Sequence, residues 1–173
     1  MTIEELNELT PEDADEALLS CCGSTAWSKA VAGRRPFDDL AALLEAADEE
    51  WSKLGRDDWL EAFAAHPKIG DMTSLKSRFS HTRSWANEEQ AGASSASETV
   101  LALLSQGNKK YKKRFGYIFV VSAAEKSAAQ MLRILKERLN NDPEAELEVA
   151  AAEQQKITEL RLQKLIDRDT ADA

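Results

Sequence analysis

Hydrophobic residues recur along most of the chain at the spacing of helical faces. The clearest stripe ends at Gly55 and consists of Leu40, Leu43, Leu44, Ala47, Trp51 and Leu54. A stripe of this kind buries one side of a helix and leaves the other side in water. Because the spacing is helical and not the alternation typical of half-buried strands, it predicts an all-α fold.

Capping residues and breaks in the pattern predict about eight helices. Thr10-Pro11 opens the first helix, because Thr is a favoured N-cap and Pro suits the first turn, and Gly23 closes it. The other predicted helices cover residues 24–33, 37–54, 57–66, 84–91, 97–106, 122–139 and 143–167, with a loop at 67–80. No repeat or low-complexity linker interrupts them. We therefore expect a single-domain helical bundle over residues 1–173, with a polar tail from about 168 to 173.

One segment, Tyr117 to Val121, breaks the helical pattern. Its β-branched and aromatic residues follow Gly116 and have strand propensity. A lone strand would have no partner in a helical bundle. We expect a buried extended segment that leads into the next helix and whose backbone groups find hydrogen-bond partners elsewhere.

Charge and composition exclude several classes of protein. The 173 residues contain 22 Lys and Arg against 31 Asp and Glu, a formal net charge of −9. This acidic balance argues against nucleic acid as a partner, since phosphate binding requires a basic surface. No apolar run approaches the length of a membrane span, so we expect no membrane partner.

The few cysteines and histidines limit metal and redox chemistry. Cys21 and Cys22 are adjacent and cannot form a disulfide framework, which favours a reducing compartment. The N-terminus lacks the features of a signal peptide and the C-terminus lacks a peroxisomal address, so we expect a cytoplasmic protein. Two histidines without paired cysteines cannot build a zinc site, and no calcium loop, phosphate loop or nucleophile elbow is present. We expect neither a metal site nor a cofactor.

Two residues stand out as candidates for chemistry. His66 precedes Pro67 at the end of an apolar helical face, where an imidazole can sit on a rigid element and face open space. A lone histidine at a helix end is more often structural or solvated, and that alternative stays open here. Arg161 shares the inward face of the last helix with Ile157, so it needs an anionic partner.

Other polar residues have a simpler interpretation. His81 lies in a polar stretch, and Glu88-Glu89 is typical of a solvated helix face. Five basic residues crowd positions 109–114, which indicates a solvated charge run first and a local anion site second.

Several sequence blocks together resemble the 2-oxo-4-hydroxy-4-carboxy-5-ureidoimidazoline (OHCU) decarboxylase family. They occur in order over roughly residues 20 to 165: Cys22-Gly23-Ser24-x-x-Trp27, Arg35-Pro36-Phe37, His66-Pro67-x-Ile69-Gly70, Trp85-x-x-x-Glu89-Gln90-Ala91-Gly92, Asn108-x-x-Tyr111-x-x-Arg114-Phe115-Gly116-Tyr117-x-Phe119, Lys126-Ser127, and Ala151-x-Glu153-Gln154-x-Lys156-Ile157-Thr158-x-Leu160-Arg161-Leu162. Each block alone is weak, but the ordered set is specific.

The resemblance implies an all-helical homodimer that decarboxylates OHCU to (S)-allantoin in urate degradation without a metal or organic cofactor. It implies His66 as the catalytic histidine and Glu89 as its acidic partner. The implied substrate-binding residues are Pro67, Gln90, Ile118, Phe119, Val120 and Arg161, with the backbone of 118–120 lining the pocket.

One position departs from the family pattern, which usually reads Trp-Ser-x-x-Glu-Gln: Ala86 stands where Ser is usual. The missing hydroxyl leaves two alternatives beside the decarboxylase. One is a non-catalytic helical interaction module on the same fold, and the other is a decarboxylase of a related ureide. A purely structural bundle would not need His66-Pro67 and a buried Arg161 together.

Overall fold

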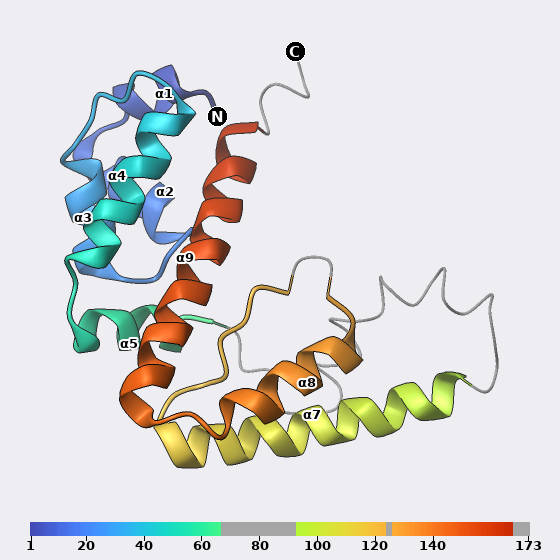
Figure 1. Ribbon diagram of the computed structural model, residues 1–173. Coiled ribbons are helices and arrows are strands. Elements are labelled where there is room, and N and C mark those ends of the chain that lie inside the picture. The colour runs from blue at the N-terminus through green and yellow to red at the C-terminus, as the bar shows by residue number, and fades with distance from the viewer. Residues whose placement is uncertain (67–92, 124–125, 168–173) are drawn as a thin grey trace. The chain divides into compact units, whose positions relative to one another are not determined.

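The computed structural model describes residues 1–66, 93–123 and 126–167 (Figure 1). These residues form eight helices and no strand, which confirms the predicted all-α class. They separate into two compact units. The first is built from residues 1–66 and 151–167, and the second from the described residues between 67 and 150. One domain for the whole of residues 1–173 stays a prediction. No helix formed by the described residues combines the length and hydrophobicity needed to span a bilayer.

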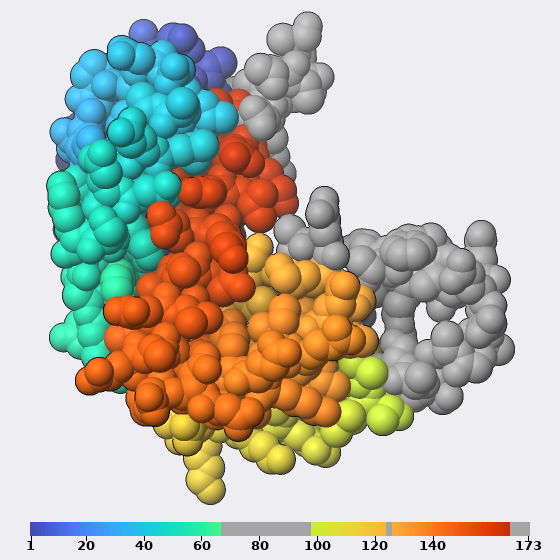
Figure 2. Space-filling view, viewed as in Figure 1, coloured from blue at the N-terminus to red at the C-terminus, as the bar shows by residue number. Residues whose placement is uncertain are grey.

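The first unit contains five short helices and the later part of a long one. The five are α1 (Ile3–Glu8), α2 (Pro11–Leu19), α3 (Thr25–Ala32), α4 (Leu40–Ser52) and α5 (Arg56–Ala64), and the long helix is α9 (Pro143–Asp167). In Figure 2 the α9 residues of this unit, in red, lie against its blue-to-green residues. Apolar side chains from all six helices fill the core, including Leu6, Leu18, Trp27, Leu43, Phe63 and Leu162, each fully buried.

Tryptophan indoles join the helices of this core. The Trp27 Nε1 donates to the Ala47 carbonyl at 3.0 Å, which fixes α3 on α4. The Trp51 Nε1 donates to the Ala151 carbonyl at 3.0 Å, which fixes α4 on α9. Because a buried N–H without a partner is costly, these bonds set where the large rings can lie.

The second unit contains α7 (Ala93–Phe115), α8 (Ala128–Arg138) and the first turns of α9. The two helices α7 and α8 pack side by side (Figure 1). Leu101, Leu104 and Tyr111 of α7 and Leu135 of α8 are buried. The segment from Tyr117 to Val121 is neither helix nor strand, and Tyr117, Val120 and Val121 are buried. The prediction of a largely buried, non-helical segment is therefore confirmed.

The prediction for the middle of the chain placed the end of α7 too early, at residue 106. The helix continues to Phe115, and the five basic side chains at 109–114 lie outside its buried face. Gly107 does not break the helix. A Cβ at this position would lie 2.4 Å from the Leu135 Cδ2 of α8. The glycine serves close helix packing, and the helix stops instead at Gly116, whose φ of +87° favours glycine.

The prediction also differs from the structure elsewhere. Helix α7 begins at Ala93 and not at residue 97. The helix expected from 122 begins at Ala128, because Ser127 and Gln130 form a capping box. Helix α2 ends at Leu19 rather than at Gly23. Helix α1 was not predicted, although Thr2 and Glu5 form a capping box at its start. The predicted loop at 67–80 and helix at 84–91 lie outside the described residues.

Candidate active site

His66 follows the last turn of α5, in the first unit. Its backbone N–H donates to the Phe63 carbonyl at 3.3 Å, so the residue continues the turn that ends the helix. Phe63 is fully buried and anchors this end of α5 in the core. The imidazole therefore projects from a rigid element, as the sequence predicted.

The link between α2 and α3 packs directly on the end of α5. A Cβ placed on Gly23 would lie 2.2 Å from the Ala65 Cβ, so only glycine fits there. Nearby, the Glu61 carboxylate accepts hydrogen bonds from the Thr25 N–H at 3.0 Å and from the Thr25 hydroxyl at 3.1 Å. These contacts join α3 to α5 and fix the position of the residue before His66.

The His66 imidazole is hydrogen-bonded to Gln154 of α9. The His66 Nε2 lies 2.5 Å from the Gln154 Oε1, and the Gln154 Nε2 donates to the Thr158 hydroxyl at 3.2 Å. A carbonyl oxygen only accepts, so His66 donates through Nε2–H, and in the neutral ring Nδ1 holds the lone pair. Gln154 is fully buried and thus selects one tautomer of His66.

Arg161 lies on the same face of α9, seven residues and about 10 Å of helix beyond Gln154. It is partly buried, and its Nη1 donates to the Cys21 carbonyl at 3.4 Å. No carboxylate in the described part of the chain pairs with it. The anionic partner predicted for this residue is thus not supplied there, and a guanidinium with one long bond to a carbonyl can bind an external anion.

The two cysteines beside Arg161 are buried free thiols. Burial raises the pKa of the Cys22 thiol to about 11, although the Ser24 backbone, Thr158 and Arg161 each lower it slightly. Burial raises the pKa of Cys21 as well. Both thiols are therefore protonated at neutral pH and are poor nucleophiles.

The structure brings together only part of the predicted site. His66 and Arg161 share the first unit, and Ile118, Phe119 and Val120 belong to the second. The remaining predicted residues, Pro67, Glu89 and Gln90, lie outside the described residues, as do Ala86 and His81. Within the described residues no cluster of His, Cys, Asp or Glu could hold a metal ion.

Sequence reasoning missed Gln154 and Thr158 as parts of the site. Their spacing could have identified them. Gln154 and Thr158 precede Arg161 by seven and three residues, so all three lie on one helical face. What the sequence did not show was that this face meets His66, which is 88 residues away from Gln154 along the chain.

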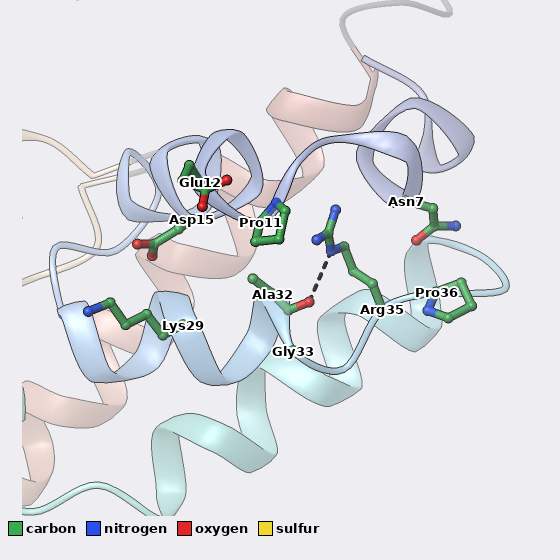
Figure 3. A pocket seen from close by; sticks show the side chains of 9 residues that line it. All are labelled: Asn7, Pro11, Glu12, Asp15, Lys29, Ala32, Gly33, Arg35 and Pro36. Carbon is green, nitrogen blue, oxygen red and sulfur yellow. Dashed lines mark hydrogen bonds between the residues drawn. The ribbon is translucent and has the colours of Figure 1, made fainter.

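A separate open hollow of about 770 Å³ lies in the first unit, between α1, α2 and α3 (Figure 3). It is lined by Asn7, Pro11, Glu12, Asp15, Lys29, Ala32, Gly33, Arg35 and Pro36. The Arg35 guanidinium donates to the carbonyls of Leu6, Leu9 and Ala32 at 2.8–2.9 Å. These bonds join the end of α1 to the end of α3, which gives this arginine a structural role.

Comparison with known proteins assigns the chain to a family. The family model described as OHCU decarboxylase matches residues 7–163, nearly the whole sequence. The chain belongs to the OHCU decarboxylase family. The resemblance inferred from the sequence blocks is therefore confirmed.

Relatives of the OHCU decarboxylase family agree with the match. The chain is 41% identical over 145 residues, 84% of its length, to the uric acid degradation bifunctional protein TTL of Arabidopsis thaliana, and spans 45% of that protein. It is 32% identical over 137 residues to the 2-oxo-4-hydroxy-4-carboxy-5-ureidoimidazoline decarboxylase of Mus musculus, covering 79% of this chain and 76% of that one. The chain thus spans less than half of the bifunctional relative.

The chain shares its fold with a solved structure. It is a crystal structure of OHCU decarboxylase in the presence of (S)-allantoin, with 38% sequence identity and a TM-score of 0.70. The match covers 88% of this chain and 98% of that one. The similarity therefore extends over both compact units.

Proposed function

We propose that this chain decarboxylates OHCU to (S)-allantoin and uses His66 as its acid–base group. The observation that supports this most directly is the bond from His66 to Gln154, on the α9 face that also bears Arg161. One face of α9 thus bears Gln154, which orients the proton-transfer group His66, and about two helical turns further along it bears Arg161, an anion-binding group. A decarboxylase that acts on a carboxylate needs both.

The reaction can proceed with side chains alone, because the substrate supplies its own electron sink. The bond between the ring carbon and its carboxylate breaks, and CO₂ leaves. The electron pair passes into the adjacent ring C=N, and the ring nitrogen takes up a proton from solvent. The ring hydroxyl then loses its proton and becomes a carbonyl while the ureido-bearing carbon receives a proton. The protein must orient the carboxylate and deliver one proton to one face, so we propose that no metal or organic cofactor takes part.

His66 has the properties that these proton transfers need. A histidine titrates near neutral pH, so it can accept the hydroxyl proton or return one to carbon. With Nε2–H donated to Gln154, the Nδ1 side of the neutral ring is the basic side. Delivery of the proton from one fixed side would give the (S) product.

The other roles follow the family pattern carried onto this chain. We assign Glu89 as the acidic partner of His66 and Arg161 as the anchor for the carboxylate or ureido group. Pro67 and Gln90 would contact the substrate, and the backbone of 118–120 would line the pocket. We further propose a cytoplasmic homodimer whose partner is the small-molecule substrate, with no nucleic acid involved.

Ala86 supports one alternative substrate. The family's usual serine hydroxyl is absent at this position, which leaves space and removes a hydrogen bond. A related ureide with a bulkier group at that point would fit such a pocket. A non-catalytic interaction module would also tolerate Ala86, but it would have no need of His66, Glu89, Gln90 and Arg161 together.

The decisive experiment supplies freshly generated OHCU to the purified chain and follows the circular dichroism of allantoin as it forms. We expect rapid formation of the (S) enantiomer with the wild-type chain and loss of this signal with His66→Asn. The matched control is His81→Asn, which removes the chain's other histidine and should leave the rate unchanged.

Three outcomes would contradict the proposal. Stereospecific decarboxylation at the wild-type rate by His66→Asn would exclude the histidine mechanism, and an inactive wild-type chain would favour the interaction module. Turnover of a related ureide but not of OHCU would favour the alternative substrate.

Glu89→Gln distinguishes a catalytic from a structural role of Glu89. If Glu89 is catalytic, the variant loses turnover with little change in folding, whereas if it is structural, the variant loses the fold.

A further inference from the structure

The second unit contains a buried ion pair between Arg138 and Glu146. The Arg138 Nε and Nη2 lie 2.7 and 2.5 Å from the Glu146 Oε1, and the two side chains are 6% and 0% exposed. The same carboxylate accepts from the Tyr111 hydroxyl and, at 3.0 Å, from the Asn141 Nδ2. Glu146 is therefore fully hydrogen-bonded, as a buried charge must be.

The third donor of the guanidinium binds the irregular segment between α7 and α8. The Arg138 Nη1 donates to the Val120 carbonyl at 2.6 Å. Val120 is only 3% exposed, and in this segment no helix or strand ladder is available to pair its carbonyl. A charge-assisted bond of this kind is stronger and shorter than one between neutral groups.

The same guanidinium also holds the residue before Val120. The Arg138 Cζ lies 4.7 Å from the centroid of the Phe119 ring and 5.7 Å from that of Tyr111. The Phe119 and Tyr111 rings meet edge to face at 5.4 Å. Arg138 thus fixes one backbone carbonyl and one adjacent side chain of the segment.

Stability alone does not account for this arrangement. A buried ion pair often contributes no more to stability than apolar residues of equal size, because desolvation offsets the attraction. What apolar residues could not reproduce is the directed bond to the Val120 carbonyl. The cluster therefore specifies the conformation of residues 118–120.

We propose that Arg138 is a positioning residue for substrate binding: by holding Phe119 and Val120, it keeps the backbone of 118–120 in the conformation that receives OHCU. This inference rests on the proposed function, in which that backbone lines the pocket. Arg138 itself does not touch the reacting atoms in this scheme. Its loss should weaken binding more than it slows the chemical step.

The test compares Arg138→Lys with Tyr111→Phe. Lysine keeps the charge near Glu146 but lacks the planar fork that reaches the Val120 carbonyl as well. We expect Arg138→Lys to raise KM for OHCU about tenfold while kcat changes far less. Tyr111→Phe removes the hydroxyl that donates to Glu146 and accepts a long bond, 3.4 Å, from the Arg138 Nη2. It leaves the bond from Arg138 to the Val120 carbonyl in place, so it should lower Tm with little change in KM.

A second measurement, amide hydrogen exchange, reports on the segment without relying on enzyme activity. Amide hydrogen exchange over residues 117–121 should be faster in Arg138→Lys than in Tyr111→Phe. If Arg138→Lys does not fold, Glu146→Gln replaces it: the variant keeps Arg138 but removes its charged partner, and we expect the same rise in KM and in exchange.

An unchanged KM and unchanged exchange in the folded Arg138 or Glu146 variant would overturn the inference, as would an equal rise in KM in Tyr111→Phe. Failure of the proposed function would give a different result from failure of this inference, because the wild-type chain itself would then be inactive on OHCU. In that case exchange over residues 117–121 still tests whether Arg138 holds the segment.

Discussion

Gly23 and Ala65 approach so closely that a methyl group on Gly23 would lie 2.2 Å from the Ala65 Cβ. Ala65 immediately precedes His66 in the chain. The short contact therefore ties the link between α2 and α3 to the position of the candidate catalytic imidazole.

Replacing Gly23 with Ala should destabilise the first unit and reduce activity together. Relief of the overlap must move the end of α5, and overpacking of this kind costs about 1–3 kcal/mol. Thermal unfolding and kcat/KM would measure both effects, and Ala65→Gly in the same chain should restore much of the loss. The control is Gly55→Ala, where a Cβ meets nothing within 4 Å. Equal stability of the Gly23 and Gly55 variants would contradict the prediction.

Replacing Gln154 with Glu should raise the pKa of His66. A carboxylate next to Nε2–H favours the imidazolium, by about one pKa unit or more. The basic form of His66 would then appear only at higher pH, so the acidic limb of the kcat/KM profile should move to higher pH. NMR titration of His66 gives the pKa directly.

Gln155→Glu is the matched control for this change, because it adds the same charge at the neighbouring position of α9, on a different face. Its profile should coincide with that of the wild-type chain. Coincidence of all three profiles would show that the contact between His66 and Gln154 does not influence the catalytic proton transfer.

Replacing Arg161 with Met should raise KM about tenfold or more, because the substrate carboxylate loses a charge-assisted partner. The chain carries a net charge of −9, so its overall field does not attract the anion and a local cation must. Arg161→Lys should recover part of the loss, since it restores the charge without the fork. Arg34→Met, which removes an exposed arginine paired with Glu49 at 2.7 Å, should leave KM unchanged.

The buried Cys22 thiol predicts a loss of stability at alkaline pH. Its pKa is raised from 9.0 to about 11 in the folded chain. Below pH 9 the thiol is protonated in both states, and its contribution to stability is fully present. As the pH rises from 9 to about 11, the unfolded chain ionises first, so the free energy of unfolding falls by about 2–3 kcal/mol in total. Denaturant unfolding of the wild-type chain and of Cys22→Ala over this range should show a shallower decline in the variant, and identical slopes would refute the assignment.

Local patterns were sufficient to predict most of the fold. Ser24 and Pro143 marked helix starts, and the stripe through Trp51 marked a buried face, because caps and periodicity act within a few residues. Gly107 misled the prediction for the opposite reason. Whether a glycine breaks a helix or admits a neighbouring one depends on Leu135, which lies on another helix.

The candidate site was only partly predictable from residue patterns. His66 and Arg161 stood out because a histidine before proline and an inward arginine are unusual in apolar helical faces. Gln154 did not stand out, since its role depends on α9 meeting the end of α5. Arg138 likewise gave no local sign that it would bind the Val120 carbonyl.

The first unit is discontinuous in sequence, since residues 1–66 pack with residues from 151 onward. During synthesis the N-terminal helices leave the ribosome first, yet the α9 surface that completes their core follows Trp51 by 100 residues. The Ala151 carbonyl that Trp51 binds lies 100 residues later in the chain, and the Gln154 that His66 binds lies 88 residues later. The candidate catalytic imidazole therefore gains its orienting partner only when nearly all of the described chain has been translated.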